Sequence, residues 1–146
     1  MDYHFNQGVL TLFPGDWQDC SLHILRDKRS GLSVVISQAE LSPDESLQQA
    51  LTQQWQAVKD SARILTQSPF TARSVGADHD IEAIEVETQF DQSGQTLWQK
   101  QLAVKLLDPA RLMVFTLSAQ QTFTAEQTEQ WQHLSHSLVL THASQG

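Results

Sequence analysis

Residues 84–119 read IEVETQFDQSGQTLWQKQLAVKLLDPARLMVFTLSA, and this stretch decides the fold. Apolar and polar residues alternate without a fault over 84–90, which predicts a half-buried strand. A turn signal at 91–94 leads into a second strand over 96–107, which Asp108-Pro109 ends, and a third strand follows over 111–119. The stretch therefore predicts an antiparallel meander of three strands.

Upstream of the meander, period-two apolar runs predict three more strands. They lie at 9–12, 20–25 and 32–38, and a turn at 28–31 joins the last two as a hairpin. We expect these three strands to be neighbours in one sheet.

Two capping boxes predict two helices. Ser42 and Glu45, with Pro43 at the first helical position, predict the start of the first helix. Its apolar stripe extends over about five turns, through Leu47, Ala50, Leu51, Trp55, Val58, Ala62 and Leu65.

The second capping box, Thr124 with Gln127, predicts a final helix from about Ala125, with Phe123 as a hydrophobic staple. This helix presents Trp131, Leu134 and Leu138 to the core and ends before Thr141, leaving a short, loose polar tail. The order of strands, helix, strands and helix predicts one α+β domain over residues 1–146, with helices packed on a twisted antiparallel sheet.

Charge and composition exclude several classes of function. The chain has 146 residues and a formal net charge of -8, which disfavours nucleic acid as a partner. The densest basic run, residues 26–29, is interpreted as a solvated turn. No export signal begins the sequence and no apolar run approaches the roughly 20 residues of a membrane span, so we expect a cytoplasmic protein that does not itself enter a bilayer.

No catalytic or metal-binding constellation emerges from the sequence. His133 and His136 lie three residues apart on the last helix, but two ligands do not make a metal site. Cys20 and His23 would point to opposite faces of a strand, which prevents a thiolate–imidazole pair. Glycine-rich phosphate-binding motifs are absent from the sequence. We therefore expect a protein that is not an enzyme and that carries no cofactor or metal.

Apolar residues occupy both faces of several predicted strands, at 22–25, 34–36 and 112–115. Two helices are too few to cover both faces of such a sheet completely. Part of one face is therefore available as an apolar binding surface. The alternative is that loops and the N-terminal segment cover it. Periodicity does not distinguish the two.

The opening of the chain resembles the effector-associated (Eag) chaperones of bacterial type VI secretion. Tyr3-His4-Phe5-Asn6 and the stretch 9–19, with the distinctive Pro14-Gly15-Asp16-Trp17, carry the resemblance. The later strands and both capped helices follow in the same order as in that family. The resemblance implies a fold similar to the Mog1 and PsbP proteins and a homodimeric chaperone.

The resemblance also implies a partner. Members of this family bind the N-terminal transmembrane segments of effectors, often Rhs toxins with a PAAR domain, and help to load them onto the VgrG spike. The expected client-binding residues are apolar strand positions with glutamines nearby: Leu22, Ile24, Val34, Ile36, Gln38, Gln99 and Gln101. A rival hypothesis is a carrier of a small molecule or lipid, because the same sheet could wall an apolar cavity.

Overall fold

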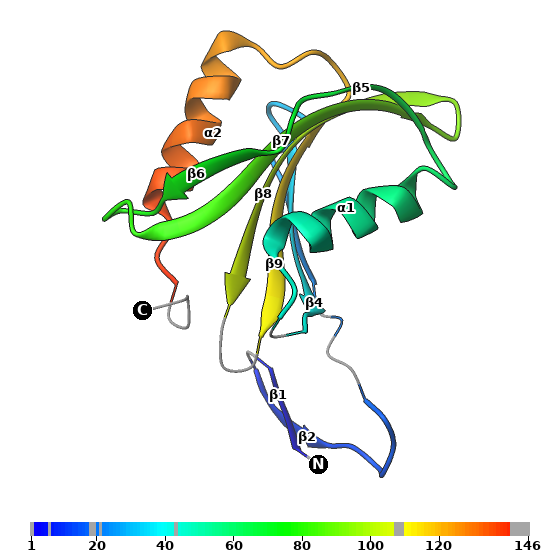
Figure 1. Cartoon of the computed structure of the whole chain (residues 1–146), viewed down its shortest axis with the longest axis vertical. Helices are drawn as coiled ribbons and strands as arrows, with labels where there is room; N and C mark the ends of the chain where they lie inside the picture. The colour runs from blue at the N-terminus through cyan, green and yellow to red at the C-terminus, as the bar shows by residue number, and fades with distance from the viewer. Residues whose placement is uncertain are drawn as a thin grey trace.

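The computed structural model describes residues 2–5, 7–17, 20, 22–42, 44–106 and 110–140, and within them the main element is a seven-stranded antiparallel sheet (Figure 1). The strand order is β3-β4-β9-β8-β7-β5, and β6 also pairs with β7. The strands are β3 (Leu22–Arg26), β4 (Ser33–Glu40), β5 (Arg63–Gln67), β6 (Thr71–Val75), β7 (Ile81–Gln92), β8 (Gln95–Leu106) and β9 (Arg111–Ala119).

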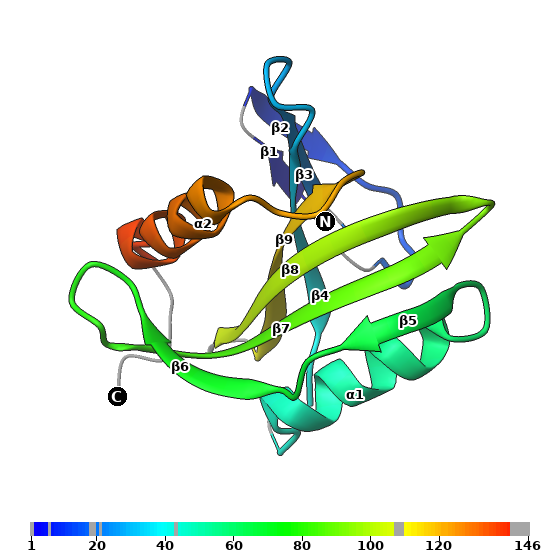
Figure 2. The same cartoon turned by 90° about the horizontal axis from the view of Figure 1, so that it is seen from above.

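Two helices, α1 (Leu47–Val58) and α2 (Ala125–Ser137), cover opposite faces of this twisted sheet (Figure 2). Hydrophobic side chains pack into one cluster on each side. The cluster on the α2 side includes Leu102, Phe115 and Trp131, and the cluster on the α1 side includes Leu51 and Ala103. The predicted α+β architecture, with an antiparallel sheet and two main helices, is confirmed.

The meander that the sequence predicted is β7, β8 and β9, paired in that order. Ser93 and Gly94 connect β7 to β8, and both have positive φ angles, 53° and 79°. A two-residue loop with two positive φ angles is a type I′ turn, whose twist matches that of the flanking strands. The predicted break at Asp108-Pro109 lies outside the described residues.

The predicted hairpin near the N-terminus is also present, as β3 and β4, with Leu22 opposite Ser37 and Ile24 opposite Val35. The expectation that residues 9–12 form a neighbouring strand of the same sheet was wrong. That segment is β2 (Gly8–Thr11), which pairs with β1 (Asp2–Phe5) in a separate two-stranded sheet. Figure 1 shows this hairpin projecting from the end of the main sheet.

Helix α1 begins four residues later than the sequence predicted. Its N-cap is Ser46, which exchanges capping-box hydrogen bonds with Gln49, while Glu45 donates its backbone N–H to the Ser42 carbonyl in a preceding turn. The pattern of a serine followed three residues later by Glu or Gln occurs twice in succession, and the second copy caps the helix. Pro43 lies outside the described residues.

Helix α1 also ends earlier than predicted, at Val58, so the expectation that Ala62 and Leu65 continue its stripe was wrong. Ala62 lies in the turn before β5 and Leu65 lies within β5, where the neighbouring Ile64 pairs with Phe90. The apolar residues 58, 62 and 65 have the spacing of a helix, although the segment after residue 62 pairs with strand β7. The short strand β6, which the sequence did not predict, pairs with the first half of β7.

Helix α2 begins at Ala125 as predicted, with the Thr124 and Gln127 capping box in place. Trp131 is buried, and Leu134 and Leu138 pack against the cluster on the α2 side. The loop after β6 holds the end of the helix, because the Gly76 N–H donates to the Ser135 carbonyl at 2.9 Å. The predicted polar tail, residues 141–146, lies outside the described residues. Within the described residues, neither helix is long and apolar enough to cross a bilayer.

Candidate functional site

A groove opens on the α1 side of the sheet, between the C-terminal half of α1 and strands β4, β8 and β9. We call it the α1-side groove, and it measures about 310 Å³. All the residues that line it in the described part of the chain are uncharged. They are Val35, Gln54, Trp55, Val58, Ser61, Phe90, Gln92, Gln99, Gln101, Thr116 and Ser118.

The floor of this groove is a ladder of amide and hydroxyl groups. Gln101 donates from its Nε2 to the Thr116 Oγ1 at 3.2 Å, and Gln99 donates to the Ser118 Oγ at 3.2 Å. Each bond joins residues that are directly opposite in the β8–β9 register, so the sheet itself positions both pairs. An amide group can form up to four hydrogen bonds, so the ladder keeps donor and acceptor capacity for a ligand.

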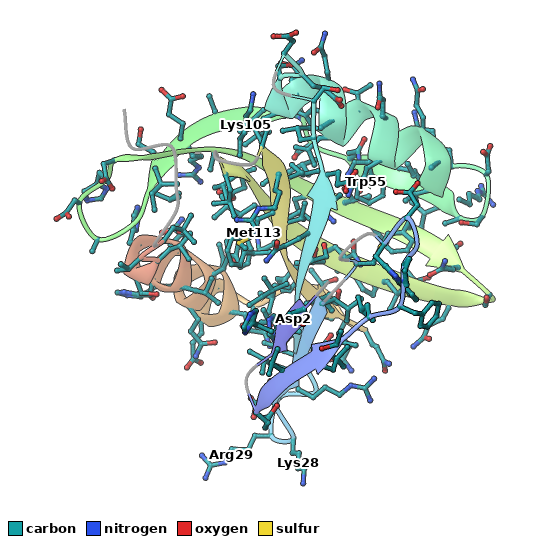
Figure 3. The ribbon with its side chains drawn as sticks, turned by 90° about the horizontal axis from the view of Figure 1, so that it is seen from below. Asp2, Lys28, Arg29, Trp55, Lys105 and Met113 are labelled. Atoms are coloured by element: carbon teal, nitrogen blue, oxygen red, sulfur yellow. The ribbon has the colours of Figure 1, made fainter. Side chains whose placement is uncertain are left out.

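An aromatic wall stands beside the ladder. Trp55 of α1 packs edge-to-face on Phe90 of β7, with ring centroids 6.1 Å apart, and its Nε1 donates to the Gln101 Oε1 at 3.0 Å. Figure 3 shows Trp55 between α1 and the sheet. Because Trp55 is buried, this hydrogen bond holds Gln101 in one orientation.

The edge strand β3 lies beside this groove, next to β4. Ile24 lies directly opposite Val35 and Leu22 opposite Ser37, which puts both on the α1 side. Ile24 is 54% exposed and Leu22 is 52% exposed. An edge strand that exposes large apolar side chains next to a neutral groove is typical of an interaction surface.

The predicted client-binding residues therefore do not line one surface. Leu22, Ile24, Gln99 and Gln101 share the α1 side, but Val34, Ile36 and Gln38 point to the α2 side. Val34 and Ile36 pack against the core cluster there, and Gln38 accepts a hydrogen bond from Arg111 at 3.1 Å. The hairpin register causes this division, because Leu22 pairs with Ser37 and not with Ile36.

Sequence reasoning missed the residues that complete the groove. Val35 takes the place that was expected for Val34 and Ile36, and Thr116 and Ser118 supply the hydroxyls of the ladder. Their signal in the sequence is the polar alternation at 116 and 118 within an otherwise apolar strand. Trp55 was identified as part of an apolar helix stripe, but its hydrogen bond to Gln101 joins elements 46 residues apart and has no local signal.

The histidines show contacts but no metal site. His136 packs against His79, with ring centroids 4.9 Å apart, and His133 lies 3.9 Å from Glu129 on the exposed face of α2. Among the described residues, no group of three or more His, Cys, Asp or Glu side chains could hold a metal ion. Cys20 is exposed and precedes β3.

Comparison with known proteins gives matches to a family model and to solved structures. The family model described as DcrB matches residues 8–137, most of the chain. A Pseudomonas aeruginosa protein of unknown function has a similar crystal structure, with a TM-score of 0.67, 18% sequence identity and 96% of each chain covered. At that identity the likeness shows a shared fold. A search of curated proteins found no match.

Proposed function

The chain belongs to the DcrB family, and from this premise we propose that it is a cytoplasmic chaperone of type VI secretion. Its client would be an effector of the PAAR or Rhs type, whose N-terminal transmembrane helices it shields before loading onto the VgrG spike. The observation that carries the proposal is the uncharged α1-side groove with its amide ladder, beside which β3 exposes apolar residues on the same face of the sheet. The resemblance of residues 3–19 to the Eag chaperones, and with it a Mog1/PsbP-like fold, supports the same proposal.

The chemistry of the groove suits a helix that will later enter a membrane. Such a helix carries about 20 apolar residues, and exposing them to water costs about 25 cal/mol per Å². Ile24, Leu22 and Val35 offer apolar surface, and the absence of charge among the lining residues avoids burying an unpaired ion against the client. Gln99 and Gln101 can hydrogen-bond to the small polar residues that transmembrane helices carry at packing interfaces.

The size of the groove argues for two copies of the chain. A 20-residue helix is about 30 Å long and about 10 Å wide, so a groove of about 310 Å³ contacts only part of one side. The β1–β2 hairpin exposes Val9 and Leu10, and Phe13 is exposed just after it. Within the described residues, the outer edge of β3 pairs with no other strand. We propose that these surfaces meet in a homodimer that encloses the client from two sides.

The dimer proposal predicts a measurable mass. Light scattering after size exclusion should give twice the chain's 16.4 kDa, and Phe13→Asp should shift it toward 16.4 kDa, because Phe13 is 70% exposed and would place a charge in the apolar interface. Lys59→Glu, which changes an exposed charge at the end of α1, is the control and should leave the mass unchanged. A monomeric wild-type protein, or a dimeric Phe13→Asp variant, would contradict the dimer.

Coexpression tests whether this chain binds a transmembrane segment of an effector. A tagged N-terminal segment of a PAAR or Rhs effector, containing one predicted membrane-spanning helix, should be insoluble alone and soluble in complex with this chain. A segment with two central leucines replaced by lysine should no longer be retained, because burying these charges in the neutral groove is costly. The proposal fails if the unaltered segment stays insoluble, or if both segments copurify equally well.

A further inference from the structure

Arg26 lies at the end of β3, on the same face of the sheet as Ile24. It follows Ile24 by two residues, and alternate residues of a strand point to the same side. Its direct partner on β4 is Ser33, and the partner of Ser33 on β9 is Ser118. Because Ser118 belongs to the amide ladder, a cation lies two strands away from the α1-side groove, on the same face.

The strand register gives the α1 side of the sheet two different ends. At one end, a row of polar residues crosses six strands, from β3 to β5: Arg26, Ser33, Ser118, Gln99, Thr88 and Gln67. A second row, four residues or about 13 Å further along the strands, is mainly apolar: Leu22, Ser37, Val114 and Ala103. A helix that lies along β3 and β4 therefore meets polar groups and a cation at one end only.

The charge of Arg26 is available to a partner. Its side chain is exposed, and none of the ion pairs among the described residues includes it. The neighbouring Asp27 is occupied by the turn, where it accepts hydrogen bonds from the Ser30 hydroxyl at 2.7 Å and from the backbone N–H of Arg29 at 3.2 Å. These two bonds, that from Ser30 first, lower the pKa of Asp27. Asp27 therefore shapes the turn and does not neutralise Arg26.

The cations nearby have other surroundings. Lys28 and Arg29 follow in the turn, and Figure 3 shows them pointing away from the protein. Lys105 is on the α1 side at the other end of β8, where it donates to the Glu45 carbonyl at 3.1 Å, just before α1. Within the described part of the β3–β4 hairpin, Arg26 is therefore the cation that a helix along these strands would contact.

The two ends of a helix differ in charge. The last four carbonyl groups of a helix have no partner within it and carry a partial negative charge, while the first four N–H groups carry a partial positive charge. A cation stabilises the C-terminal end and destabilises the N-terminal end. A helix in the α1-side groove therefore has the lower free energy when its C-terminal end lies at Arg26.

We infer that Arg26 sets the direction of the client helix, whose C-terminal end lies at Arg26 of the copy that holds it. It also selects the client, favouring an acidic residue directly after the helix over a lysine or arginine. The guanidinium can donate both to the free carbonyls and to such a carboxylate, whereas a client lysine would meet a like charge there. The inference rests on the proposed chaperone function and adds to it the direction and flanking charge of the client.

Four forms of one effector segment test the inference. Each contains the same membrane-spanning helix of a PAAR or Rhs effector, with a single Glu or Lys placed directly before or directly after it. The Glu and Lys forms for one position are coexpressed with the full chain, and mass spectrometry measures their ratio in the purified complex. We expect a ratio of about five in favour of Glu after the helix, and no preference for Glu before it. The net charge of -8 favours Lys at either position, so a preference for Glu at one position requires a local cation.

Substitutions of Arg26 assign this preference to its side chain. Arg26→Gln should bring the ratio after the helix to about one or below, because the local cation is lost. Arg26→Glu should reverse the preference, so that the Lys form is retained better, a gain that damage to β3 would not produce. Arg29→Gln removes a charge from the same turn, where the side chain points away from the protein, and is the matched control. It should keep the preference for Glu.

The results separate this inference from the chaperone proposal. Equal capture of the Glu and Lys forms after the helix, the same preference for Glu before it, or a preference that survives Arg26→Gln would each overturn the inference and leave the chaperone proposal standing. If the wild-type chain retains none of the four forms, the chaperone proposal fails, and the inference fails with it.

Discussion

The Ile24→Asp variant is expected to lose capture of the client helix while it stays folded. Ile24 is 54% exposed on the α1 side of β3, and burial against a client would contribute about 1.5–3 kcal/mol. The aspartate loses this contribution and adds the cost of placing a carboxylate against an apolar helix. Together these changes should weaken binding by about 100-fold or more. The measurement is the yield of soluble client segment in coexpression.

The neighbouring residue provides the matched control. Leu25 is 58% exposed and lies on the same edge strand, but its side chain points to the α2 side. Leu25→Asp therefore introduces the same charge at nearly the same exposure, and client capture should stay at the wild-type level. If both variants lose the client equally, the effect comes from damage to β3 or its edge and the groove assignment is wrong. If Ile24→Asp alone unfolds, Ile24 belongs to the core.

The Leu102→Ala variant is expected to lose about 2–5 kcal/mol of stability. Leu102 is fully buried in the centre of β8, in the cluster that contains Phe115 and Trp131. Replacing a buried leucine with alanine removes its transfer free energy and leaves a cavity, which together cost about 2–5 kcal/mol. That is a large part of the roughly 5–15 kcal/mol that stabilises a domain. Urea unfolding followed by circular dichroism measures the change.

Leu65→Ala is the control for this measurement. Leu65 is 39% exposed in β5, so the same substitution there should cost less than about 1 kcal/mol. A loss below about 1 kcal/mol for Leu102→Ala would show that the sheet centre is less tightly packed than the structure indicates. A loss at Leu65 as large as that at Leu102 would show that β5 carries a buried contact in solution.

The sequence predicted the centre of the fold better than its periphery. Strands β8 and β9 and the start of α2 were predicted within one residue, and β7 within three, because alternation, turn residues and a capping box are all local signals. The ends of α1 were wrong on both sides. Ser42 and Ser46, four residues apart, offered two equivalent caps at the start of the helix. At its other end, only the pairing of Ile64 with Phe90 shows that this segment is a strand.

For the site, the sequence by itself determined which kinds of residue are available. It showed apolar residues on both faces of the strands at 22–25 and 34–36, glutamines at 99 and 101, and no charge between 32 and 39. These features follow from composition and alternation alone. They suggested an apolar binding surface on the sheet, with coverage by loops and the N-terminal segment as the alternative.

Only the tertiary structure decided which of these residues lie together. The β3–β4 register places Ile24 beside Val35 and Leu25 beside Val34, and so divides the predicted set between the two faces of the sheet. A shift of one residue would exchange the faces of all of β3, and local sequence does not encode that choice. It depends on which side of β4 packs on Phe115 and Leu117 and which side faces Thr116 and Ser118. The packing of residues that are distant in the sequence, and not the pattern along the chain, therefore decides which apolar residues of β3 and β4 face α1 and which face α2.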